Sequence, residues 1–74
     1  MVAELPCLRG REVARIFESF GWIIARQKGS HIVMTKEDER ATLSIPDHKE
    51  VAKGTLRSLI RAANLTVDEF LARI

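Results

Sequence analysis

The sequence predicts an α+β domain in which one helix precedes a three-stranded antiparallel sheet and two helices follow it. Two observations support this order. Apolar residues recur with a helical period before residue 21 and after residue 52, whereas the intervening segments have the β-branched and alternating character of strands. A chain of 74 residues has room for one domain only, so residues 1–74 are expected to form a single unit.

The first helix is predicted over residues 11–20. Four apolar side chains are spaced at i, i+3, i+4 and i+7, which places them on one face that would point into the core. Arg9 and Gly10 occupy the position where a serine or threonine cap is expected, so the start is weakly signalled, whereas Gly21 supplies a stop. The four apolar residues are Val13, Ile16, Phe17 and Phe20.

Three strands are predicted between residues 22 and 45. Residues 22–26 and 31–35 are rich in β-branched residues and are joined by a turn over 27–30, which indicates a hairpin. A charged loop at 36–40 leads to a third strand at 41–45, which alternates between apolar and polar residues. We expect an antiparallel meander with the helices on its apolar face and the other face free for solvent or a partner.

A second helix is predicted over residues 53–63, after a polar connection that begins where Pro46 ends the third strand. Its outer face carries Lys53, Arg57 and Arg61 at intervals of four residues, which forms a basic stripe. Such a stripe can bind the phosphates of a nucleic acid, although on small helices it is more often a solvated face. The inner face carries Leu56, Leu59, Ile60 and Ala63.

A third, short helix is predicted to begin after Thr66. Thr66 and Glu69 have the spacing of a capping box, and Leu65 and Phe70 have the spacing of a hydrophobic staple. Asn64 is expected in the left-handed conformation between the two helices. The complete order is that of the double-stranded RNA-binding fold with one extra helix, which alone is weak evidence of function because a fold hosts many functions.

Composition limits the classes of function. The net charge is +2, with basic residues dominating both ends of the chain and acidic residues the segment 36–50, a distribution that is compatible with nucleic-acid binding. Cys7 is the only cysteine, so no internal disulfide can form and a reducing compartment is expected. The sequence shows neither a membrane-spanning run nor a signal peptide at its start, so a cytoplasmic location without membrane attachment is predicted.

The turn between the first two strands holds the strongest candidate site. Gly29 permits a positive φ, Lys28 offers a mobile cation, and His31 stands at the entrance of a strand, where its ring can face a ligand and transfer a proton. The same residue types are also common in plain hairpins. His48, the only other histidine, is a candidate second acid or base or else a structural residue of its loop.

Other kinds of catalytic site are disfavoured. Cys7, His31, Asp47 and His48 lack the spacing of a zinc site, so no metal site is predicted. Ser30 and His31 are adjacent, and neighbours on a strand point to opposite faces, so they make a poor nucleophile and base.

Several segments together resemble the HicA (YcfA-type) toxin family. They are Gln27–His31 before an apolar strand, Ile45–His48, the helix Lys53–Ala63 with its Gly-Thr-Leu-Arg entrance, and Leu65–Leu71. This resemblance implies an mRNA endoribonuclease with the double-stranded RNA-binding fold, neutralised by a HicB antitoxin encoded beside it. It also implies that His31 is the catalytic histidine, and it implies no cofactor.

The resemblance suggests a mechanism. Without a metal, RNA cleavage can use the 2′-hydroxyl as an internal nucleophile, and it then needs a base, a cation near the phosphate and an acid for the leaving oxygen. His31 would serve as base or acid, Lys28 would stabilise the phosphate, and Gly29 and Ser30 would add backbone donors. His48 is a possible second proton-transfer group.

Two other classes of function stay open from the sequence. The chain could be a non-catalytic RNA-binding module that uses the stripe of Lys53, Arg57 and Arg61. Alternatively, it could be an interaction domain whose exposed sheet face binds only a protein partner. Cleavage that depends on His31 separates the first hypothesis from both of these.

Overall fold

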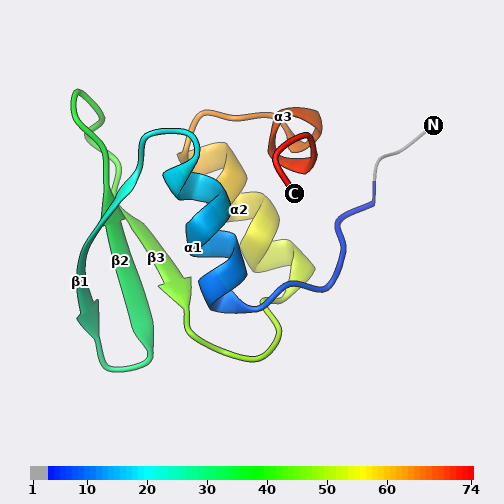
Figure 1. Cartoon of the computed structure of the whole chain (residues 1–74), viewed down its shortest axis with the longest axis horizontal. Coiled ribbons are helices and arrows are strands. Elements are labelled where there is room, and N and C mark those ends of the chain that lie inside the picture. The colour runs from blue at the N-terminus through cyan, green and yellow to red at the C-terminus, as the bar shows by residue number, and fades with distance from the viewer. Residues whose placement is uncertain (1–3) are drawn as a thin grey trace.

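The computed structural model describes residues 4–74 and confirms the α+β order (Figure 1). One helix leads into three strands, and two helices follow. The elements are α1 (Gly10–Glu18), β1 (Ile23–Lys28), β2 (His31–Thr35), β3 (Leu43–Pro46), α2 (Lys53–Ala62) and α3 (Val67–Leu71).

Three elements differ from the prediction by two residues at one end, each for a local reason. Helix α1 begins at Gly10 and ends at Glu18, because the chain turns over the next residues before Gly21 takes a φ of 96°. Strand β1 continues to Lys28 because the hairpin turn needs only two residues. Strand β3 is short, and it includes Pro46, which an edge strand can accommodate.

The three strands form an antiparallel meander in the order β1-β2-β3, and the helices cover one face of it (Figure 1). Helix α1 packs against all three strands, whereas α2 packs against β3. The register is regular except for a bulge between Ile24 and Arg26, where Ala25 is the extra residue of β1. The prediction that the helices share one face is confirmed.

No helix of residues 4–74 lies on the other face of the sheet, which we call the open face (Figure 1). Residues opposite each other on antiparallel strands share a face, and Ile32 and Ile45 are paired and buried in the core. Their neighbours along the strands therefore point away from the core. The open face carries Ile23, Arg26, Lys28, His31, Val33, Thr35, Ser44 and Pro46.

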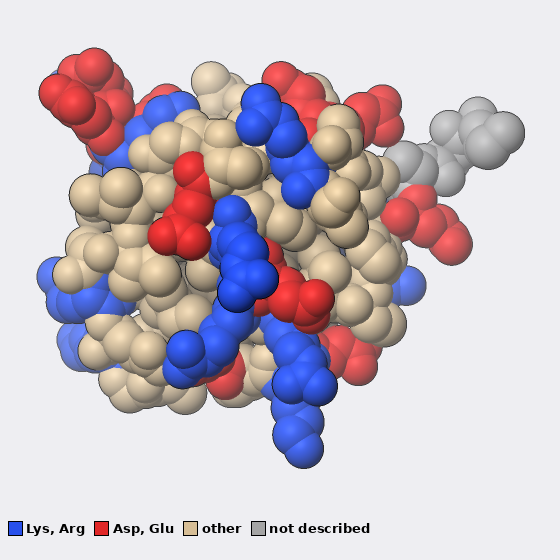
Figure 2. Space-filling view, in the orientation of Figure 1, with Lys and Arg blue, Asp and Glu red and all other residues tan. Residues whose placement is uncertain are grey.

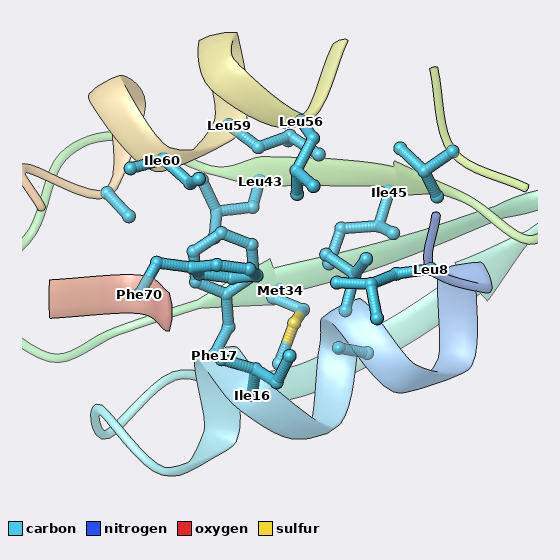
Figure 3. Packing of buried hydrophobic residues seen from close by; sticks show 14 of the residues in the cluster. Leu8, Ile16, Phe17, Met34, Leu43, Ile45, Leu56, Leu59, Ile60 and Phe70 are labelled. Atoms are coloured by element: carbon cyan, nitrogen blue, oxygen red, sulfur yellow. The ribbon is translucent and has the colours of Figure 1, made fainter. Parts of the chain in front are cut away.

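The core lies between the sheet and the helices (Figure 3). The rings of Phe17 from α1 and Phe70 from α3 are tilted against each other with centroids 5.2 Å apart, so α3 closes one side of the core. Trp22 and Met34 are almost completely buried in the same cluster. Phe20, which was predicted to face the core, is half-buried against it.

The signals predicted around α3 are confirmed. The Thr66 hydroxyl accepts from the Glu69 N–H at 3.1 Å, and the Glu69 carboxylate accepts from the Thr66 N–H at 2.9 Å. Asn64 has a φ of 61°, as expected of a residue between two helices. Leu65 packs against the core that contains Phe70.

Among residues 4–74, no helix combines the length and the apolar character that crossing a membrane requires.

Candidate active site

The turn between β1 and β2 consists of Gly29 and Ser30 alone. Gly29 has a φ of 59° and Ser30 has no positive φ, the pattern of a type II′ hairpin turn. A Cβ atom on Gly29 would meet no atom within 4 Å, so the glycine is required by the backbone conformation and not by packing. The tight turn places Lys28 directly opposite His31.

His31 is exposed on the open face, where Lys28 lies across from it on β1 and Pro46 on β3. Side chains of directly opposite residues have Cβ atoms about 5 Å apart, so the His31 imidazole and the Lys28 ammonium can contact one ligand. The site is open to solvent and can admit a polymer. An imidazole can accept a proton from a hydroxyl of the ligand while a neighbouring cation binds the phosphate of the same ligand.

The connection after β3 holds this turn through Asp47. The Asp47 N–H donates to the Ser30 carbonyl at 2.7 Å. The Asp47 carboxylate accepts from the Gln27 amide at 2.9 Å and pairs with the Arg11 guanidinium at 3.4 Å. With its side chain only 19 % exposed, Asp47 links the hairpin to α1. Sequence reasoning treated it as part of a polar connection and assigned it no role.

Helix α1 contacts the same connection through Gly10. The Gly10 N–H donates to the His48 carbonyl at 3.0 Å, and a Cβ on Gly10 would collide with the Pro46 carbonyl oxygen. Gly10 is thus the first residue of the helix and the point of its close approach to β3, rather than a weak cap. The Glu12 carboxylate accepts from the Arg9 N–H at 3.0 Å, which gives half a capping box because an arginine side chain has no acceptor.

His48 faces a different part of the surface from His31. It lines a shallow hollow with Arg9, Arg11, Asp47 and Lys49, and His31 does not line this hollow. The Asp47 carboxylate contacts Gln27, which is paired with the buried Ile32 and so points to the helix side of the sheet. Within residues 4–74, no hydrogen bond joins the two histidines.

The basic stripe of α2 is exposed as predicted, but it leads away from His31. Arg57 and Arg61 line a hollow with Ile60, Leu65 and Val67, at the end of α2 that leads to α3. Strand β3 and the connection that contacts Ser30 lie at the opposite end, where α2 begins.

Lys53, at the start of α2, is the member of the stripe that lies nearest along the helix to this connection. Figure 2 shows lysine and arginine side chains gathered in the lower half of the view, with acidic side chains among them. The β1–β2 turn and the start of α1 lie at the same end of Figure 1.

A second residue that sequence reasoning missed is Arg26. It lies on the open face, two residues before Lys28 on the same strand, so the two side chains point the same way. The spacing of Arg26 and Lys28 by two residues could have shown that both lie on one face of a strand. The predicted strand ended at Arg26, however, and Lys28 was assigned to the turn. Within residues 4–74, no group of three His, Cys, Asp or Glu side chains is close enough to hold a metal ion.

Solved structures contain the same fold. A chain in the structure titled "Toxin-Antitoxin complex from Streptococcus pneumoniae" superposes with a TM-score of 0.70 and 37 % sequence identity, covering 78 % of this chain and 98 % of that chain. The fold of this chain is therefore similar to that of a chain from a toxin–antitoxin complex. The model of the HicA toxins of bacterial toxin–antitoxin systems matches residues 10–65, and the chain belongs to this family. No curated protein sequence matches the chain.

Proposed function

We propose that this HicA-family toxin is an endoribonuclease that cleaves mRNA in the cytoplasm with His31 as its proton-transfer residue. The observation that supports this most directly is the exposed His31 paired with Lys28 across a two-residue turn on the open face. A histidine side chain can act as a general base or acid, and the lysine supplies the cation that a reacting phosphate needs.

The proposed reaction uses the substrate's own 2′-hydroxyl. His31 takes the proton of this hydroxyl while its oxygen attacks phosphorus, and the bond from phosphorus to the 5′ oxygen breaks. The products are a 2′,3′-cyclic phosphate and a free 5′-hydroxyl. Lys28 and the backbone N–H groups of Gly29 and Ser30 stabilise the charge on the phosphate. We assign the proton for the leaving oxygen to water rather than to His48, because His48 lines a hollow beside the start of α1 and His31 is not among the residues that line it.

We further propose that a HicB-type antitoxin inhibits the toxin by covering the open face. The structural neighbour from Streptococcus pneumoniae is a toxin–antitoxin complex, and the open face of this chain has no helix that shields His31. Covering the histidine would block access of RNA to it.

Parallel expression of the wild type, His31→Ala and His48→Ala tests the proposal. Growth arrest and loss of full-length mRNA on a northern blot are expected for the wild type and for His48→Ala, and not for His31→Ala at equal levels of soluble protein. Equal activity of the wild type and His31→Ala would contradict the catalytic role. Loss of activity in His48→Ala alone would move the assignment to the second histidine.

A second candidate function rests on the exposed stripe of α2. Lys53, Arg57 and Arg61 project from one helix face and could bind RNA phosphates without cleavage. Under this alternative, salt-sensitive RNA binding would survive His31→Ala, no RNA would be cut by the wild type, and binding would be lost when the three residues are replaced by glutamine.

A further inference from the structure

Arg26 occupies a defined place beside the candidate catalytic histidine. In the register of the hairpin, Arg26 lies opposite Val33 and Lys28 lies opposite His31, so the four side chains form two adjacent rows on the open face. Arg26 and His31 are diagonal neighbours in this grid. Diagonal pairs in an antiparallel sheet lie about 7–8 Å apart, which an arginine side chain can span.

The burial of Val33 indicates that neighbouring side chains on the open face cover it. It is only 8 % exposed, although it lies on the face that has no helix and is not part of the main core cluster. Only neighbouring side chains on the same face can cover it. Arg26 and Ser44 lie directly across from Val33, and His31 and Thr35 lie two residues away along β2. The methylene groups of an arginine can cover an apolar residue while the guanidinium stays in water.

Arg26 and Lys28 are two neighbouring cations on the same face of β1. Both are exposed, and within residues 4–74 neither forms an ion pair or a side-chain hydrogen bond with another residue. Residues two apart on a strand are separated by about 7 Å, so each cation can contact a different phosphate of one extended strand. Arginine also presents a planar fork of donors that suits a phosphate.

The open face offers charge and no aromatic surface on which bases could stack. The chain contains three phenylalanines, one tryptophan and no tyrosine. All four aromatic side chains lie in the core or pack against it. A single strand on this face would therefore be held mainly by its phosphates, with a strong dependence on salt and little selection among bases.

We propose that Arg26 is a substrate-binding residue that holds the phosphate next to the scissile one, so that single-stranded RNA runs along β1 with its reacting phosphate at Lys28 and His31. This inference rests on the proposed ribonuclease function. It assigns the RNA path to the open face rather than to the stripe on α2.

Binding and cleavage are measured separately to test this path. Binding is followed by fluorescence anisotropy with a mixed-sequence, single-stranded 2′-O-methyl RNA, which lacks the nucleophile and so cannot be cut. The variants are Arg26→Gln, Arg26→Lys and Arg40→Gln. Arg40 is the matched control because it is an exposed arginine in the loop between β2 and β3, at the other end of β2 from His31.

We expect Arg26→Gln to weaken RNA binding roughly fivefold at low salt. The slope of the logarithm of the binding constant against the logarithm of the salt concentration should become shallower by about 0.7, the value for one phosphate contact on a single strand. Arg26→Lys should restore most of the slope, and Arg40→Gln should behave like the wild type. In cleavage of natural RNA, Arg26→Gln should raise KM more than it lowers kcat. Equal thermal unfolding of the variants controls for folding.

The two proposals fail differently. If the wild type cuts RNA but Arg26→Gln matches Arg40→Gln in slope and KM, the RNA path is wrong and the ribonuclease function stands. If the wild type cuts no RNA but Arg26→Gln still lowers the slope, the ribonuclease function is wrong and the phosphate-binding site stands. An equal loss with Arg26→Gln and Arg40→Gln would mean that only net charge matters, which also overturns the path.

Discussion

At the scale of single residues, Asp47 holds the candidate site in place although its carboxylate contacts Gln27 on the helix side of the sheet. Its backbone holds the hairpin turn at Ser30, and its carboxylate contacts Gln27 and Arg11. The carboxylate is partly buried, but both of its donors are exposed, so water can replace it as their acceptor and each contact adds only a modest stabilisation.

Replacing Asp47 with alanine is expected to lower the free energy of unfolding by about 0.5–1.5 kcal/mol, the net contribution of one hydrogen bond, because the contact with the Gln27 amide is lost. Asp47→Asn is the matched control, since it keeps an acceptor for Gln27 and removes only the charge that pairs with the exposed Arg11. Urea denaturation followed by circular dichroism measures both. An Asp47→Ala variant as stable as the wild type would show that the backbone alone holds the turn.

Cys7 is exposed, and its thiol donates to the Glu50 carboxylate at 3.3 Å. This hydrogen bond and the negative charge of Glu50 raise the pKa of Cys7 above its ordinary value of 9.0. A raised folded-state pKa favours folding below pH 9, and this contribution is lost as the pH rises through the folded value.

Alkylation of Cys7 by iodoacetamide near pH 9 should therefore be slower in the folded protein than in the urea-unfolded chain. Glu50→Gln should speed the reaction in the folded state, because it removes the repulsion between the carboxylate and the thiolate. Mass spectrometry of timed samples gives the rates. Identical rates for the wild type and Glu50→Gln would contradict an effect of Glu50 on the thiol.

At the scale of elements, two glycines in helices have opposite roles. Gly10 begins α1 where a Cβ would collide with the Pro46 carbonyl, whereas Gly54 lies in the first turn of α2 with no atom near its Cβ position. Gly10→Ala should cost about 1–3 kcal/mol through overpacking. Gly54→Ala should stabilise the protein by up to about 1 kcal/mol, because glycine is a poor helix former. Thermal unfolding of both variants measures the contrast, and a shift in the same direction for both would refute it.

The elements themselves could be predicted because their signals are local. The spacing of apolar residues in α1 and the capping box at Thr66 each lie within a few residues. The roles of Gly10 and Asp47 could not be predicted, since they depend on contacts such as Arg11 with Asp47, which are 36 positions apart in the chain. The bulge at Ala25 was also missed, because the apolar run before it shows no alternation that would mark an extra residue.

The candidate site was predicted in part for the same reason. The turn of Gly29 and Ser30 is a local signal, and the structure places Lys28 opposite His31 as a hairpin requires. The relation of this turn to His48 and to the stripe on α2 depends on how β3 and α2 are placed. Sequence spacing carries no information about which histidine faces which side of the sheet.

At the scale of the whole molecule, the two histidines have different surroundings and can report separately on a partner. His31 is exposed on the open face, and His48 lines the hollow beside α1. If the proposed antitoxin covers the open face, complex formation should protect His31 from modification by diethylpyrocarbonate while His48 stays reactive. Peptide mapping of the modified chain, free and in complex, measures the ratio. Unchanged reactivity of His31 in the complex would exclude simple occlusion.

Because Trp22 is buried, its intrinsic fluorescence can be used to follow the folding of the protein. It is the only tryptophan, there is no tyrosine, and its indole N–H has no hydrogen-bond acceptor among the described residues. An indole in such apolar surroundings emits at short wavelength, and exposure to water on unfolding moves its emission to the red. Because Trp22 belongs to the core, RNA on the open face would leave this emission unchanged. Intrinsic fluorescence therefore follows folding in the presence of substrate without any label.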